Sequence, residues 1–227
     1  AGSTIKTDIG GSVAVKGQTV SVFGTIEAPA GGISIEGGRK FPLASKQEAS
    51  TTSALPTVYL ASSARMLAPG ATKTTFDPFG RNMGEVFGGG TIRVSGNIVA
   101  ESGALLDVSG ISQELDFHPS SLDRSLRASA GDGLFSKPWG QKSMPVVVDS
   151  NGGVISLRGS QLLLSDATLL AKAGGPKAVG GLLAVSSDAY TIETGADITL
   201  RVKQSGNAIG KGNGEIGVGL PVFDSEG

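Results

Sequence analysis

The chain contains no cysteine and only one histidine, His118, among its 227 residues. The absence of cysteine excludes disulfides and thiol chemistry. A single histidine excludes a catalytic histidine pair and a metal site built from several histidines within this chain. The most familiar catalytic arrangements are therefore missing, and the sequence predicts neither a cofactor nor a metal centre.

An excess of charge of one sign is also lacking, because 19 basic and 20 acidic residues leave a net charge of −1. The chain therefore lacks the excess of positive charge that binding to nucleic acid or to an anionic membrane surface would favour. No run of 18 apolar residues occurs and no basic-apolar-small signal peptide opens the chain, so we expect no membrane insertion. The first residues, Ala1 to Ile5, already have the pattern of a strand and turn. We therefore expect a segment from the interior of a longer protein.

Glycine, by contrast, is abundant: its 36 residues make up about 16% of the chain, roughly twice ordinary usage. Aromatic residues account for only 5%. Glycine suits corners where φ is positive or where two backbones approach closely. The hydrophobic residues, 39% of the chain, alternate with polar ones and can line a core, which argues against disorder.

The stretch from Gly88 to Gly110 contains three short strands separated by glycine and small polar residues, at residues 91–94, 97–100 and 104–108. Apolar side chains alternate within them, as expected when successive side chains point to opposite faces. Strands this short are not stable alone, and their connections are too short for the helices of βαβ units. A chain with three brief strands and three tight corners in about twenty residues can pair each strand with its equivalent one turn later. This predicts an all-β parallel solenoid with about three short strands per turn.

Double glycines that precede an apolar strand mark where the turns begin. Their second glycines are 21, 58, 63 and 28 residues apart. The first three separations are near one or three times twenty, so we expect one turn and then three turns twice, with an insertion in the last interval and about eight turns in all. These dipeptides are Gly10-Gly11, Gly31-Gly32, Gly89-Gly90, Gly152-Gly153 and Gly180-Gly181.

Three stretches interrupt the recurring pattern of short strands. They are predicted as loops extruded from a single domain, 1–227. They span residues 36–56, 71–87 and 111–149. The favoured interpretation is that they lie against the coil wall and bury their own aromatic side chains. The alternative is a recognition patch on a rigid scaffold, since loops usually carry specificity. The residues that would form such a patch are Phe76, Phe79, Arg81, Phe117, His118 and Trp139.

Carboxylates require separate consideration, because β-solenoids also serve as scaffolds for enzymes that cleave polysaccharides. Such sites need acids and a base that converge on one exposed face. Asp107 stands between Leu106 and Val108, so we expect it to point outward, toward solvent or a corner hydrogen bond. The other acids are scattered, and the sequence predicts no catalytic residues. They include Glu114, Asp116, Asp123, Asp166, Asp188 and Asp197.

A series of motifs in residues 57 to 200 resembles the filamentous haemagglutinin family, very large bacterial exoproteins of two-partner secretion. The order of the motifs is more specific than any one of them. The family's amino-terminal Asn-Pro-Asn motifs have no counterpart here, and an Arg-Gly-Asp triplet is absent. The motifs are Val58-Tyr59-Leu60, Asp77-Pro78-Phe79-Gly80-Arg81, Gly84-Glu85-Val86, Gly89-Gly90-Thr91-Ile92, Gly96-Asn97-Ile98, Gly103-Ala104-Leu105-Leu106-Asp107-Val108-Ser109-Gly110 and Gly152-Gly153-Val154-Ile155-Ser156-Leu157.

The resemblance implies a right-handed parallel β-helix that forms a non-catalytic structural or adhesive shaft on the bacterial outer surface. It also implies export through an outer-membrane secretion partner, contact with flanking coils of the same parent chain, and a host-cell or glycan receptor. Two rival interpretations remain open. One is a polysaccharide-binding or polysaccharide-cleaving β-helix protein, and the other is an autotransporter passenger segment.

Overall fold

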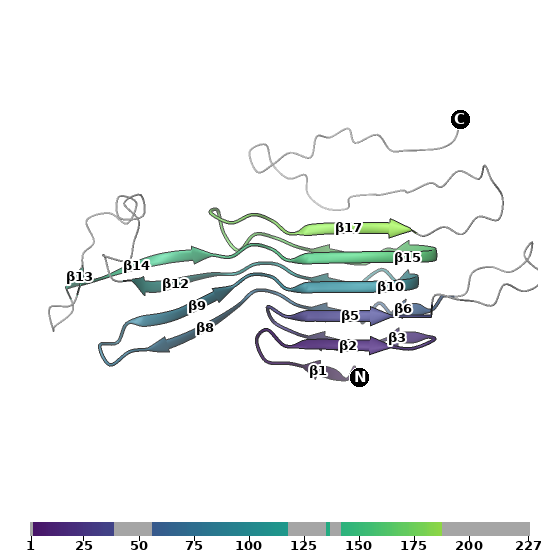
Figure 1. Ribbon diagram of the computed structural model, residues 1–227, viewed down its shortest axis with the longest axis horizontal. Helices are drawn as coiled ribbons and strands as arrows, with labels where there is room; N and C mark the ends of the chain where they lie inside the picture. The colour runs from purple at the N-terminus through teal and green to yellow at the C-terminus, as the bar shows by residue number, and fades with distance from the viewer. Residues whose placement is uncertain (1, 39–55, 118–134, 137–141, 188–227) are drawn as a thin grey trace, which may run out of the picture. The chain divides into compact units, whose positions relative to one another are not determined.

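The computed structural model describes residues 2–38, 56–117, 135–136 and 142–187, and these residues form strands, turns and no helix (Figure 1). The chain divides into two compact units, Ala1–Asp188 and Ala189–Gly227, and every described residue belongs to the first. Within these ranges no helix is long and apolar enough to cross a membrane. The sequence pattern also predicts strands at residues 190–192 and 197–202, which lie outside the described residues.

Most of the strands pair in parallel and form three columns, in which each strand lies above its equivalent from an earlier part of the chain. The first column contains β2 (Ser12–Lys16), β5 (Gly32–Glu36), the first half of β10 (Thr91–Ala100), the first half of β15 (Val154–Ser165) and β17 (Leu182–Ser187). The second contains β3 (Val20–Val22), β6 (Val58–Leu60) and the second halves of β10 and β15. The third contains β1 (Thr4–Lys6), β4 (Thr25–Glu27), β7 (Arg65–Leu67), β11 (Leu105–Asp107) and β16 (Thr168–Leu170).

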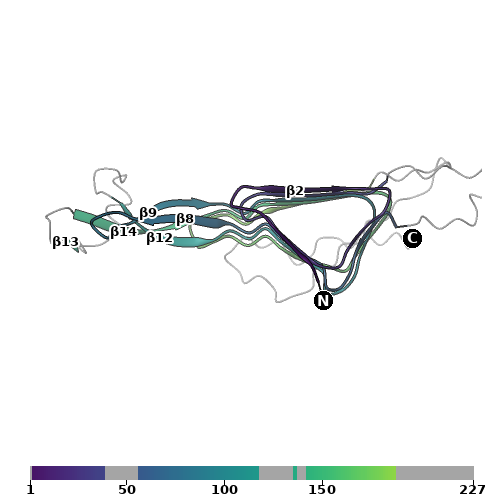
Figure 2. The ribbon, with the colours of Figure 1, turned by 90° about the horizontal axis from the view of Figure 1, so that it is seen from below.

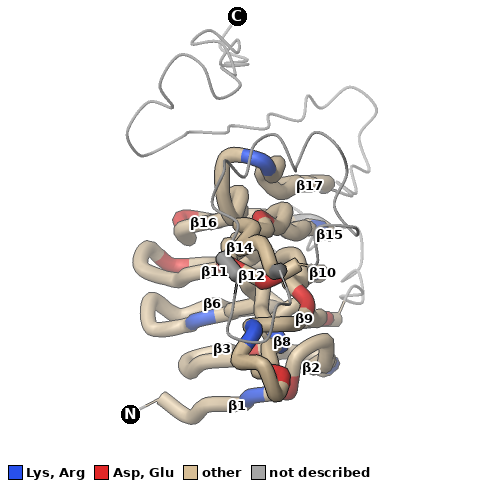
Figure 3. Tube along the Cα trace, turned by 90° about the vertical axis from the view of Figure 1, so that its left-hand side faces the viewer, with Lys and Arg blue, Asp and Glu red and all other residues tan. Residues whose placement is uncertain are grey.

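Seen along the columns, the successive levels superpose in a triangular outline (Figure 2). We use "level" for one passage of the chain through the columns, and "stack" for all levels together. Figure 3 shows the levels from the side, one above another.

The register overturns the expected count of turns. Thr91 pairs directly with Gly32 on one side and with Val154 on the other. The separations of 58 and 63 residues therefore each correspond to a single level rather than to three, because long insertions lengthen those levels. The first column of the described residues accordingly has five strands, which rise on the order of 20 Å at about 4.8 Å per step.

The core is a narrow apolar interior between the three columns. Strand alternation places Ile33 and Ile35 inside, at 1% and 0% exposure, and leaves Ser34 between them on the outer side. The same pattern confirms the expectation for Asp107: Leu106 and Val108 are buried at 1% and 0%, whereas the Asp107 carboxylate accepts a hydrogen bond from Ser109 N at 2.8 Å. Other fully buried side chains in this core are Leu60, Met66, Ile92, Val94, Ile98 and Ile155.

The corner between the first and second columns differs from the expected break between two strands. In β10 the strand continues through the corner, where the register shifts between Gly96 and Ile98. Gly96 has a φ of 133°, a conformation that side chains disfavour. Gly96 pairs with Gly159 and Ile98 with Leu163, so β15 has two more residues than β10 at this corner. Such a bulge bends a strand without ending it, so residues 91–94 and 97–100 belong to one element.

Two of the stretches predicted as loops contain antiparallel strands instead. In residues 71–87, β8 (Ala71–Phe76) pairs with β9 (Asn82–Phe87). In residues 111–149, β12 (Ser112–Phe117) pairs with β14 (Lys142–Asp149), which also pairs with β13 (Phe135–Ser136). Figures 1 and 2 show these strands projecting away from the triangular stack. Of residues 36–56, the structure describes only 36–38 and 56.

Candidate functional site

The β8–β9 hairpin ends in a five-residue turn, Asp77 to Arg81. The turn contains two of the residues predicted for a recognition patch, Phe79 and Arg81, and a third, Phe76, is the last residue of β8. Asp77 N donates to Arg81 O at 3.1 Å, and Gly80 N donates to Asp77 O at 2.9 Å. Pro78 presets the backbone for a turn, and Gly80 adopts a φ of 72° that favours glycine. The sequence Asp-Pro-Phe-Gly-Arg therefore closes the hairpin through local chemistry.

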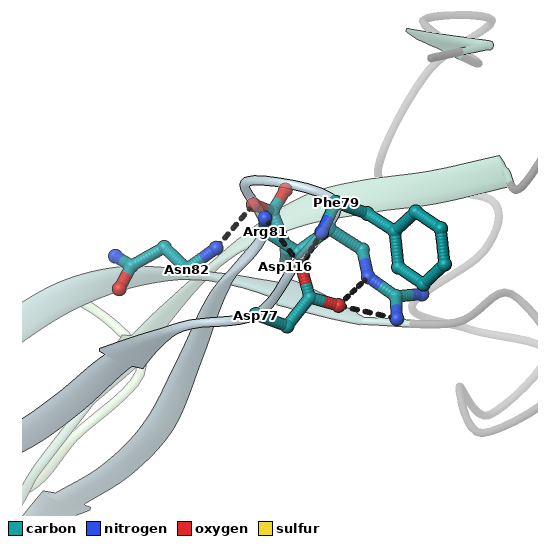
Figure 4. Close-up of polar contacts among 5 residues, drawn as sticks. All are labelled: Asp77, Phe79, Arg81, Asn82 and Asp116. Atoms are coloured by element: carbon teal, nitrogen blue, oxygen red, sulfur yellow. Dashed lines mark hydrogen bonds and ion pairs between the residues drawn. The ribbon is translucent and has the colours of Figure 1, made fainter. Parts of the chain in front are cut away.

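The Asp77 carboxylate organises this turn (Figure 4). Its Oδ1 atom accepts hydrogen bonds from Phe79 N and Arg81 N, both at 2.9 Å. Its Oδ2 atom accepts from Arg81 Nε at 2.5 Å and forms an ion pair with Arg81 Nη2 at 2.5 Å. The carboxylate thus holds both the backbone and the guanidinium of the turn.

The pKa of Asp77 reflects two opposing influences. Partial desolvation acts to raise the pKa, but hydrogen bonds from the Arg81 backbone, the Arg81 side chain and the Phe79 backbone, together with the Arg81 charge, lower it below its usual value of 3.8. Asp77 is therefore ionised at neutral pH, and the turn keeps its internal ion pair.

The fixed turn presents apolar side chains to solvent. Phe76 is 76% exposed, Phe79 41% and Met83 43%. The Arg81 guanidinium carbon lies 5.4 Å from the centre of the Phe79 ring, a cation–π geometry that holds the ring in place. The favoured interpretation, that this excursion buries its own aromatic residues, is wrong for Phe76 and Phe79.

The hairpin is anchored to the neighbouring arm through Asn82. Asn82 N donates to Asp116 Oδ2 at 2.8 Å (Figure 4), and Asn82 Nδ2 donates to Glu114 O at 2.8 Å. Both acceptors belong to β12, and the strands β10 and β11 lie between β9 and β12 in the sequence. Asp116 therefore has a structural role here, and the tip is presented from a supported base.

The structure brings together only part of the predicted patch. Phe76, Phe79 and Arg81 share one hairpin, while Phe117 is half-buried at the end of β12, opposite Met144. His118 and Trp139 lie outside the described residues. Sequence reasoning missed Asp77 as the organising residue, although an aspartate directly before a Pro-containing turn is a recognised signal for such side-chain-to-backbone bonds.

Carboxylates elsewhere support corners of the stack. Asp149 accepts from Ser112 Oγ at 2.6 Å and from Lys177 N at 3.0 Å. The Ser112 hydroxyl, followed by the Lys177 backbone, lowers the pKa of Asp149 despite partial desolvation. In the ranges that the structure describes, no three acidic or histidine side chains gather in a group that could hold a metal ion.

The chain was compared with known proteins at three levels. No family model matches it, and neither a characterised protein nor a solved structure matches it. The resemblance to filamentous haemagglutinins therefore remains a prediction based on the motifs in the sequence.

Proposed function

We propose that the chain is a right-handed parallel β-helix segment that serves as a structural and adhesive shaft of a large secreted bacterial exoprotein. The observation that carries the proposal is the in-register stack of parallel strands with a rigid hairpin projecting from it. Each level contacts chiefly the levels next to it, so such a scaffold lengthens by adding levels and stays stiff. The parts that project from it are free to make contacts.

The proposal also covers export and location. We infer that the parent protein reaches the bacterial outer surface as an unfolded chain through an outer-membrane partner, and that levels form one after another as the chain emerges. The lack of cysteine is compatible with this route, since no disulfide has to form on the way. Flanking coils of the parent chain are the expected partners at the two ends of the stack.

We assign the adhesive contact to the β8–β9 hairpin, and we propose that the segment is not an enzyme. Exposed aromatic side chains on an ordered turn are typical of recognition surfaces, because they bury a large area while losing little conformational freedom. Phe76 and Phe79 meet this description.

Adhesion of protein-coated beads to a cultured epithelial monolayer under flow tests this assignment. Beads with the wild-type chain should stay attached, and the double variant Phe76→Ala/Phe79→Ala should release most of them. Val179→Ala, at another exposed apolar position (65%), is the control and should behave as wild type. Wild-type beads that attach no better than albumin-coated beads would overturn the adhesive role.

A cleavage assay tests the alternative function, that of a polysaccharide-cleaving enzyme. Incubation of the chain with plant and bacterial polysaccharides should release no reducing ends and no unsaturated products. Sustained release of either would contradict the non-catalytic proposal.

A further inference from the structure

A second cluster of aromatic and acidic side chains lies on the outer side of the second column; we call it the wall cluster. It consists of Phe23 and Asp166, which are exposed, and of Tyr59 and Glu101, which are half-buried. Tyr59 lies between Val58 and Leu60, which are buried at 0% and 1%, so its ring points outward. The Phe23 ring, 57% exposed, comes from the level below, and its centre lies 5.9 Å from that of Tyr59. The two rings come from successive levels and are tilted by 59° relative to each other.

Glu101 adds acceptor atoms from the level above. One of its oxygens accepts a hydrogen bond from the Tyr59 hydroxyl, and the other accepts from Ser62 N at 2.9 Å. The Tyr59 hydroxyl first, and then the Ser62 backbone, lower the pKa of Glu101, so it is ionised at neutral pH. A carboxylate offers about four acceptor positions. The Ser62 side chain also hydrogen-bonds to it, so one acceptor position remains for a ligand.

Asp166 belongs to the level above Glu101 and is the fourth residue of the wall cluster. Its N–H donates to Ala100 O at 2.9 Å, and Ala100 pairs with Ser165, so Asp166 lies in register above Glu101. Asp166 is exposed. The backbones of these two acidic residues are therefore about 4.8 Å apart along the stack, at the ordinary spacing between paired strands.

We propose that the wall cluster binds an uncharged polysaccharide lying along the stack. The aromatic rings of Phe23 and Tyr59 would pack on the apolar C–H faces of sugar rings, and the carboxylates of Glu101 and Asp166 would accept hydrogen bonds from sugar hydroxyls. Their negative charge disfavours uronic-acid and sulfated chains. Figure 1 shows β3 and β6, which carry this wall, at the opposite end of the strands from the β8–β9 hairpin, so this is a separate surface.

The assignment deepens the proposed adhesive role and rests on it, because it names a ligand class for one surface of the shaft. Fluorescence anisotropy with end-labelled hexasaccharides tests it on the full chain. The uncharged probes are cello-, xylo- and manno-hexasaccharides, and a sulfated heparin hexasaccharide is the charged comparison. We expect at least one uncharged probe to bind, and the heparin probe to bind at least about tenfold more weakly.

Variants compare the wall cluster with an exposed apolar position elsewhere. Phe23→Ala should weaken binding of the uncharged probe about tenfold, and Glu101→Gln should weaken it severalfold. Val179→Ala, at an exposed apolar position (65%) outside both the wall cluster and the hairpin, should leave binding unchanged. Should Phe23→Ala disturb the circular dichroism spectrum, Tyr59→Phe supplies a milder variant, and it too should weaken binding.

The proposal is overturned if no uncharged hexasaccharide binds, if the heparin probe binds as tightly, or if Phe23→Ala and Val179→Ala have equal effects. Failure here is distinct from failure of the adhesive role. Beads that adhere to cells while no hexasaccharide binds would reject the wall cluster alone, whereas beads that do not adhere would reject the adhesive role.

Discussion

A Cβ atom added to Gly31 would overlap the carbonyl oxygen of Gly11, which lies one level below it. The same relation joins Gly90 to Gly31, Gly153 to Gly90 and Gly181 to Gly153. Each of these carbonyls also accepts a hydrogen bond from the residue that follows the glycine above, as Gly31 O does from Thr91 N at 2.8 Å. Glycine is therefore required at this corner because the backbones of successive levels approach too closely for any side chain.

The first prediction concerns this glycine column. Gly31→Ala should lower the free energy of unfolding by about 2–3 kcal/mol, because the new methyl group displaces the strand or breaks its hydrogen bond. Gly32→Ala is the matched control: its Cβ would meet only the Ser12 Cβ, at 3.7 Å, an ordinary contact. Urea unfolding at 25 °C measures both, and equal losses would show that close approach is not what selects glycine.

The second prediction concerns the apolar interior. Leu106→Ala removes a side chain that is 1% exposed and should cost about 2–5 kcal/mol of unfolding free energy through lost burial and the cavity left behind. Leu164→Ala removes the same atoms from a side chain that is 59% exposed, and should cost less than about 1 kcal/mol. Thermal unfolding of both variants compares them directly. Similar losses at the two positions would contradict the placement of the core.

The third prediction concerns the register between distant strands. Deleting residues 91–153 joins Gly90 to Val154, which occupies the same register position as Thr91 above Gly32. This variant should keep a β-sheet circular dichroism spectrum and unfold cooperatively with one level fewer. Deleting residues 91–154 shifts the following strand by one residue and turns its inward side chains outward. That variant should lose cooperative unfolding, and retention of it would argue against the assigned register.

The fourth prediction concerns pH and the hairpin turn. The folded-state pKa of Asp77 lies below its usual value of 3.8, so its ionised form is the one that the turn stabilises. The stabilisation is complete at neutral pH, and it is lost as pH falls below 3.8 through the folded-state pKa. The amide ¹⁵N shifts of Phe79 and Arg81 should stay constant from pH 7 to pH 5 and change only in strong acid.

Asp77→Asn is the control for that titration, since an amide does not titrate. In this variant the same two amide shifts should already differ at pH 7 and should then show no further acid transition. A midpoint above 3.8 in the wild type would show that the carboxylate is not stabilised by the turn.

Local features of the fold could be predicted from the sequence to within a residue or so. The sequence pattern predicts strands at residues 57–60 and 104–108, and β6 and β11 lie within these bounds. The orientation of Asp107 was also predictable, because side-chain direction alternates with every residue whatever the strand pairs with. The parallel pairing followed from strands too closely spaced to be joined by helices.

The pairing partners could not be predicted in the same way. Gly32 and Thr91 are neighbours although 58 residues separate them, because a long insertion leaves the stack and returns to it. Nothing in the local pattern distinguishes one extended level from three ordinary ones. The strands within the insertions could not be predicted either. Thr72 pairs with Val86 in a hairpin, but its polar, threonine-rich sequence lacks the apolar alternation of the strands in the stack.

The candidate site shows the same division. The sequence identified Phe76, Phe79 and Arg81, since aromatic residues are scarce in this chain and concentrate in the insertions. It could not show that Phe76 remains exposed, that Asp77 holds the turn, or that Tyr59 meets Glu101 from another level. These relations join residues brought together only by stacking.

The sequence by itself determined which side chains face inward and where the chain turns, because alternation along a strand and glycine at a corner act over a few residues. Only the tertiary structure decided which strands lie above one another and which aromatic rings reach solvent. Those outcomes depend on contacts between levels, whose separation along the chain is set by insertions of unrelated length.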